Sequence, residues 1–147
     1  MNYEEARKDF APCGIDCERC VSKKEGIVGR HSKELLECLN GFEKMAGMMS
    51  ELQPLLKNYD VFIELLRFFS EGSCPGCRNG EGVNCACTAK QCHKERKVDF
   101  CFQCNEFPCD RNAYNEHLYQ KWVTNNQNMK ELGVEIFCER EKSKSRY

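Results

Sequence analysis

The sequence predicts a mainly α-helical protein: a small helical domain with a long, irregular cysteine-rich loop region that bound metal ions pin in place. Cysteine accounts for 13 of the 147 residues, a level typical of chains held by disulfides or metal ions. Apolar residues recur at spacings of three and four in several segments, and no segment alternates convincingly like a β-strand. From Arg67 to His117 the chain contains no Leu, Ile or Met, so cross-links must supply most of the order there.

We expect a single domain over residues 1–147, because this length suits one domain. Its helical body is predicted over about residues 30–71 and 111–140. Its cysteine-rich metal region is predicted over residues 11–20 together with 73–110.

The first helical segment is predicted to hold two helices. Residues 32–50 carry apolar side chains at helical spacing, although Gly41 and Gly47 each weaken a helix by about 1 kcal/mol relative to alanine. A second helix is predicted over residues 61–70, with Asp60 as its N-cap. Between them, Gln53 and Pro54 indicate a turn or the first turn of a short helix.

The second helical segment is predicted to begin at Asp110, which can cap a helix carrying Trp122 and Met129. Residues 124–128 are a run of poor helix formers, so we expect the helix to break there. Gly133 then precedes a final helical turn or two, and the charged tail after it is expected to fray.

The cysteines gather in patterns typical of metal sites. Cys74 and Cys77 enclose a Pro-Gly turn, which lets two thiolates bind one metal ion. Cys101 and Cys104 repeat the spacing. The Cys-Pro-Gly-Cys motif also has the spacing of a redox dithiol, but it lacks the βαβ context of such proteins. Ten cysteines form the predicted ligand set: Cys13, Cys17, Cys20, Cys74, Cys77, Cys87, Cys92, Cys101, Cys104 and Cys109.

This set supplies two tetrahedral zinc sites of four ligands each, and we predict two or more zinc sites in all. We predict that Cys74, Cys77, Cys87 and Cys92 form one site. The second site is predicted to draw four ligands from the remaining cysteines of the set, Cys13, Cys17 or Cys20, Cys101, Cys104 and Cys109.

Two isolated cysteines, Cys38 and Cys138, lie beside apolar residues and are predicted to be buried, inert thiols. A third metal site of three cysteines and one histidine stays open, with His93, His117 and His31 as the candidates.

Zinc is the predicted metal, with an iron–sulfur cluster as the alternative, because all-cysteine ligand sets suit both. A radical S-adenosylmethionine enzyme shares the spacing of Cys13, Cys17 and Cys20, but this chain is too short for the barrel that such enzymes need. No nucleophile elbow, phosphate loop or open metal site is evident, so an enzyme with an unrecognised site is less favoured than a structural or interaction module.

Charge and hydropathy bound the partners. The net charge of −1 gives no overall attraction to nucleic acid, and no apolar run is long enough to span a membrane. The N-terminus lacks a secretory signal, so we expect a cytoplasmic protein, where reduced thiols favour metal over disulfides. An unidentified protein or small molecule is the expected partner.

The ordered motifs resemble an uncharacterised bacterial and archaeal cysteine-rich family called domain of unknown function 3795. The shared pattern comprises Cys-Gly-Ile-x-Cys-x-x-Cys at 13–20, Cys-x-Gly-Cys at 74–77, Cys-x4-Cys at 87–92 with a basic stretch after it, and Cys-x-x-Cys-x-x-Phe-Pro-Cys at 101–109. It departs from the family at Cys85, which stands one residue too close to Cys87, and in the filler at 88–91. The resemblance implies a metal-binding, cytoplasmic protein and no specific activity.

Overall fold

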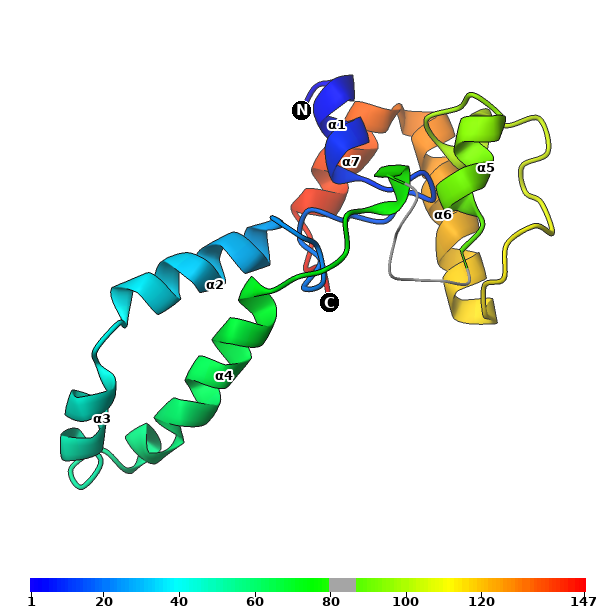
Figure 1. The fold of residues 1–147 in the computed structure, drawn as a ribbon. Helices are drawn as coiled ribbons and strands as arrows, with labels where there is room; N and C mark the ends of the chain where they lie inside the picture. The colour runs from blue at the N-terminus through cyan, green and yellow to red at the C-terminus, as the bar shows by residue number, and fades with distance from the viewer. Residues whose placement is uncertain (80–86) are drawn as a thin grey trace.

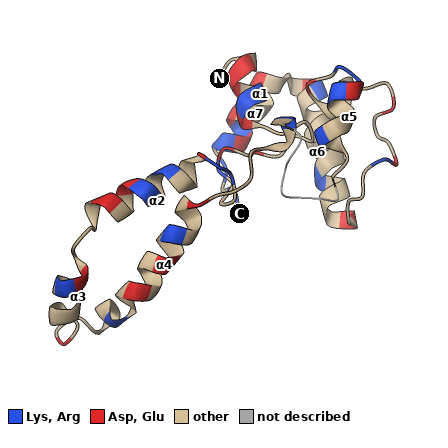
Figure 2. Ribbon diagram, viewed as in Figure 1, with Lys and Arg blue, Asp and Glu red and all other residues tan. Residues whose placement is uncertain are grey.

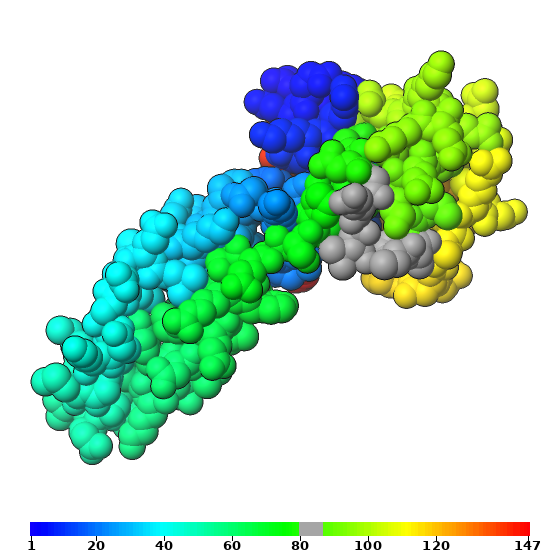
Figure 3. All heavy atoms as spheres, viewed as in Figure 1, coloured from blue at the N-terminus to red at the C-terminus, as the bar shows by residue number. Residues whose placement is uncertain are grey.

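The computed structural model describes residues 1–79 and 87–147 and is mainly helical, as predicted. In that part of the chain, β-pairing is limited to two isolated bridges. The molecule has two regions, a body that contains both termini and an arm of residues 27–70 that projects from it (Figure 1). In the space-filling view the arm forms a long lobe beside the rounder body (Figure 3).

The arm is a helical hairpin. It consists of α2 (Ile27–Cys38), α3 (Glu43–Met49), the 3-10 helix η1 (Pro54–Asn58) and α4 (Tyr59–Ser70). Helices α2 and α4 pack against each other. Gly29 allows this close approach, because a Cβ there would lie 3.3 Å from the carbonyl oxygen of Phe69.

The body contains α1 (Tyr3–Asp9), α5 (Ala89–Glu95), α6 (Glu116–Leu132) and α7 (Val134–Lys142), with short 3-10 turns η2 (Cys77–Asn79) and η3 (Cys101–Gln103). Asn2 and Glu5 form a capping box at the start of α1. Gly133 joins α6 to α7 with a φ of 86°, a value that favours glycine.

Aromatic residues supply the body core, in place of the aliphatic residues that the cysteine-rich stretch lacks. Phe100 is completely buried and packs with Phe10, Phe137 and Met129 from α6 and the chain ends. A second cluster centres on Trp122, which stacks edge-on with Phe107. The irregular segments therefore dock on α6 through aromatic side chains, and five cysteines belong to the cluster around Trp122: Cys13, Cys17, Cys77, Cys101 and Cys109.

Several predicted helix boundaries were wrong. The helix predicted over 32–50 is two helices, because Gly41 adopts a φ of 84° between α2 and α3. The third helix is capped by Asn115, whose side chain accepts a hydrogen bond from the Leu118 amide, and not by Asp110. The proline turn before α4 and the separation of α6 from α7 at Gly133 are confirmed.

The predicted break at 124–128 does not occur, because tertiary contacts outweigh the low helix propensity. Asn125 and Asn126 are buried in α6, where each hydrogen-bonds the N-terminal cysteine block. The tail does not fray either: the Arg19 guanidinium donates to three of its backbone carbonyl groups, and Tyr147 accepts a hydrogen bond from the Val21 amide.

The two isolated cysteines differ in environment. Cys138 is completely buried in the body core, as predicted. Cys38 is exposed at the end of α2, so its prediction as a buried thiol was wrong. The reason is that the arm is only two helices thick and has no further layer to cover this face.

Candidate metal-binding region

The first group of thiols forms where the N-terminal cysteine block meets the Cys-Pro-Gly-Cys turn. The Cys20 amide donates to the Cys17 carbonyl at 3.1 Å, which closes a tight turn between the two cysteines. A parallel bridge pairs Lys23 with Cys74, and the Cys74 amide donates to the Ser22 carbonyl at 2.8 Å. Backbone pairing thus places two Cys-x-x-Cys turns beside each other, although 53 residues lie between Cys20 and Cys74 in the sequence.

The Cys-Pro-Gly-Cys turn depends on its glycine and on one lysine. Gly76 adopts a φ of 92°, and a Cβ there would lie 2.7 Å from the Lys23 ammonium nitrogen. That nitrogen donates to the Pro75 carbonyl at 2.8 Å. Lys23 therefore braces the turn and adds a positive charge beside these thiols.

The pKa of the Cys17 thiol is raised to about 12, first by burial and then by the neighbouring thiols of Cys77, Cys20 and Cys74, whereas Lys23 acts to lower it. The same four thiols therefore influence one another electrostatically. The pKa of Cys77 is also raised, first by burial and then by Cys87. Cys87 thus lies near this group as well.

The second group surrounds a small cavity of about 30 Å³, which is enough room for a small occupant. Its lining includes four cysteines from α5, η3 and the loop after η3: Cys92, Cys101, Cys104 and Cys109. The Cys104 amide donates to the Cys101 carbonyl at 3.0 Å, which repeats the tight turn of the first group. The Cys101 amide donates to the Pro12 carbonyl at 2.9 Å and ties the cavity to the N-terminal block.

Aromatic side chains, among them Trp122, line part of this cavity. Within the described residues, the buried indole nitrogen of Trp122 has no hydrogen-bond partner. Burial raises the pKa of the Cys101 thiol to about 12, and the Trp122 indole beside it acts in the opposite direction. A sulfur atom carrying negative charge at this cavity would give the indole N–H an acceptor.

Two further cysteines lie between the groups. Cys13 is buried, and its pKa is raised well above the usual value by burial and then by the Cys87 thiol. The Cys87 sulfur lies 2.9 Å from the Tyr114 hydroxyl oxygen. Cys85 lies outside the described residues.

The predicted grouping of ligands differs from this arrangement in two respects. Cys74 and Cys77 lie near Cys17 and Cys20, which the sequence pattern had assigned to the other site, and Cys77 also lies near Cys87, as the pattern had suggested. Helix α5, which was not predicted, contacts η2 and places Cys92 near Cys104 and Cys109.

Of the three histidines, His93 is buried and lines the cavity, where its Nδ1 lies 2.7 Å from the Ala89 carbonyl oxygen. Burial lowers the pKa of His93. His31 and His117 are exposed, and His31 pairs with Glu34 on the arm.

The described cysteines form no disulfide bond with one another. In residues 1–79 and 87–147, no three His, Cys, Asp or Glu side chains are arranged so that they could hold a metal ion. The thiols thus gather in two groups without converging on a point, and zinc binding stays a prediction. Among the helices of the same residues, none has both the length and the apolar character needed to cross a membrane.

Sequence reasoning missed the residues that support these groups, among them Lys23, Tyr114, Asn125 and Asn126. The sequence does contain a pattern from which the burial of the two asparagines could have been predicted. They share one helix stripe with Trp122 and Met129, at spacings of three and four, so the stripe faces the core along its whole length.

Fold and site together define a small helical protein with a cysteine-rich body and a projecting helical arm. The chain belongs to the family described as protein of unknown function (DUF3795), whose model matches residues 9–114. This confirms the resemblance drawn from the motifs, and the matched segment contains all ten predicted ligands and the arm. No curated protein and no solved structure matches the chain.

Proposed function

We propose that this protein is a zinc-binding interaction module of the cytoplasm, in which two zinc ions stabilise the body and the body presents the arm. The carrying observation is the small cavity lined by Cys92, Cys101, Cys104 and Cys109. Four thiolates are a complete ligand set for structural zinc, which leaves no open position for catalysis.

The residues around this cavity suit a bound metal. Its volume of about 30 Å³ is that of a single small occupant, and the unpartnered indole N–H of Trp122 would donate to a metal-bound thiolate.

The second proposed site comprises Cys17, Cys20, Cys74 and Cys77. Support comes from the backbone pairing that brings the two turns together and from the position of Lys23, whose charge offsets that of the thiolates. Cys13 and Cys87 then remain as buried thiols between the two sites.

Metal analysis of the full chain, purified anaerobically, tests this function together with an ultraviolet–visible spectrum. We expect about two zinc ions per chain and no visible absorbance. Cys74→Ser and Cys104→Ser should each remove about one zinc, whereas Cys38→Ser should remove none, because Cys38 is exposed on the arm.

Three outcomes would count against the proposal. A brown protein with iron and inorganic sulfide would identify an iron–sulfur protein instead. Metal-free protein that is fully folded would remove the structural role. Equal zinc loss in all three variants would show that the grouping of ligands is wrong.

A further inference from the structure

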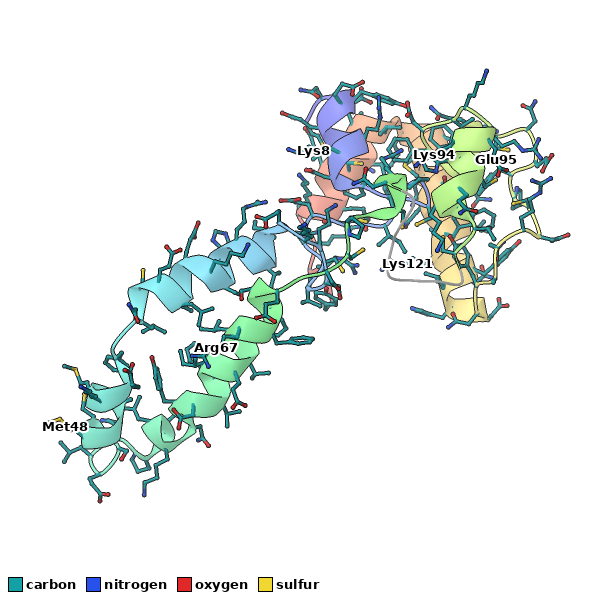
Figure 4. All side chains as sticks on the ribbon, viewed as in Figure 1. Lys8, Met48, Arg67, Lys94, Glu95 and Lys121 are labelled. Atoms are coloured by element: carbon teal, nitrogen blue, oxygen red, sulfur yellow. The ribbon has the colours of Figure 1, made fainter. Side chains whose placement is uncertain are left out.

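The arm carries most of the exposed apolar side chains of the molecule. Of the twelve large hydrophobic residues that are exposed in the described chain, ten belong to the arm: Leu35, Met45, Met48, Met49, Leu52, Leu55, Val61, Phe62, Leu65 and Phe68. Met48, at the end of the arm farthest from the body, is 81% exposed (Figure 4). Scattered apolar residues are normal on a surface, but a concentration on one element indicates an interface.

The area involved matches that of a protein–protein contact. A large side chain exposes on the order of 150–200 Å² when free, so the ten exposed fractions leave roughly 1,000 Å² of apolar surface. A stable interface of standard size buries about 800 Å² on each partner. The arm alone is therefore large enough to form one.

The exposed residues of α4 form a stripe suited to helix packing. Val61, Leu65 and Phe68 follow one another at spacings of four and three, on the side opposite the buried Leu66. Nearer the tip, an open groove of about 380 Å³ is lined almost wholly by apolar residues, including Phe42, Leu55 and Phe62. The arm thus offers both protruding apolar side chains and a groove that can receive such side chains.

The charges of the arm are mixed, which favours an identical partner over a strongly charged one. Residues 27–70 contain five Lys and Arg and six Asp and Glu, and on both α2 and α4 the basic residues lie nearer the body and the acidic residues nearer the tip (Figure 2). A surface of this kind neither repels its own copy nor attracts nucleic acid or an anionic membrane.

The C-terminal tail does not cover this surface. Arg146 donates to the Asp16 carbonyl at 3.0 Å, and the Tyr147 hydroxyl accepts from the Val21 amide at 3.0 Å, so the tail is held at the base of the arm.

We propose that two copies of this chain pair through their arms, so that two helical hairpins form one symmetric four-helix bundle. Pairing gives each hairpin the second layer that it lacks, which is the usual way for amphipathic helices to bury their apolar faces. The contact is isologous: the α4 stripe and groove of one copy meet the tip residues of the other, and the reverse. This inference deepens the proposed function by naming the partner of the module.

Multi-angle light scattering and sedimentation of the full, metal-loaded chain test this pairing. At about 100 μM we expect a mass of twice the 17.1 kDa of one chain. Leu65→Glu should raise the dissociation constant at least about 100-fold, because it places a charge in the apolar stripe. The matched control is Ile136→Glu on α7 of the body, since Leu65 and Ile136 are each 50% exposed. Ile136→Glu should change the dissociation constant of the dimer by less than about twofold.

Zinc content and circular dichroism of both variants are measured on the same samples. A monomeric wild-type chain at about 100 μM would overturn the pairing, even if it carries its zinc. So would equal effects of Leu65→Glu and Ile136→Glu, because the contact would then not lie on the arm. A dimer that persists in metal-bound wild type and dissociates only in Leu65→Glu supports it, with Phe68→Glu as the confirming second variant.

Discussion

The arm and the body are ordered by different means. In the arm, regular helices account for most residues, and α2 and α4 pack against each other. In the body, long irregular segments are held by backbone pairing, by buried aromatic side chains and by asparagine hydrogen bonds around two groups of thiols. The comparison shows that cysteines gather where regular secondary structure and aliphatic residues are scarce.

The largest expected effect is the loss of a cysteine ligand. Cys74→Ser and Cys104→Ser should each lower the free energy of unfolding of the body by at least about 3 kcal/mol, because each removes one ligand of a proposed structural zinc site. Cys38→Ser on the arm should change it by less than about 0.5 kcal/mol. Urea unfolding with tryptophan fluorescence measures the body selectively, since the single Trp122 lies there. Equal effects at Cys38 and Cys104 would remove the distinction between the regions.

The next effect concerns the buried Asn126. Its side chain accepts a hydrogen bond from the Phe102 amide and donates to the Cys13 and Trp122 carbonyls. Asn126→Ala leaves the Phe102 amide and the Cys13 carbonyl without this partner in the core and should cost about 3 kcal/mol. Gln127→Ala, on the exposed side of the same helix, is the control and should cost less than about 0.5 kcal/mol. If both cost the same in urea unfolding, Asn126 does not tie the cysteine block to α6.

A smaller loss is expected at Gly14, inside the N-terminal cysteine block. Its φ is 81°, and a Cβ there would lie 2.8 Å from Met129 Cε and 2.9 Å from Asn125 Cβ. Gly14→Ala should therefore lower the stability of the body by about 2 kcal/mol. Thermal unfolding measures this loss. If Gly14→Ala has the same midpoint temperature as the wild type, the cysteine block does not pack closely on α6.

The smallest effect has the opposite sign and lies in the arm. Gly47 is within α3, and a Cβ there would meet nothing within 4 Å. Gly47→Ala should stabilise the helix by about 0.5–1 kcal/mol through propensity alone. Helix content and thermal midpoint by circular dichroism measure the gain, and a loss would mean that this face of α3 is already covered.

The sequence was most informative where local physics decides the structure. The local pattern correctly predicted four features: the mainly helical class, the proline turn before α4, the glycine between α6 and α7, and the buried Cys138. It failed where tertiary contacts decide: residues 124–128 stay helical because two asparagines are satisfied in the core.

The ligand groups show the same limit. Spacing identified which cysteines are candidates, but it could not reveal that the strand-like pairing of Lys23 with Cys74 joins two distant turns. Nor did it indicate α5, which places Cys92 at the cavity. The apolar residues of the arm were expected to form part of a helical body, and their exposure depends on where the hairpin projects.

Hydrogen exchange of the full chain before and after zinc chelation tests the central claim most directly. The account predicts that body amides, such as that of Cys101 bonded to Pro12 and that of Cys74 bonded to Ser22, lose protection by about 100-fold or more on chelation. Amides of α2 and α4 should change by less than about threefold. Unchanged protection in the body, or an equal loss in both regions, would contradict it.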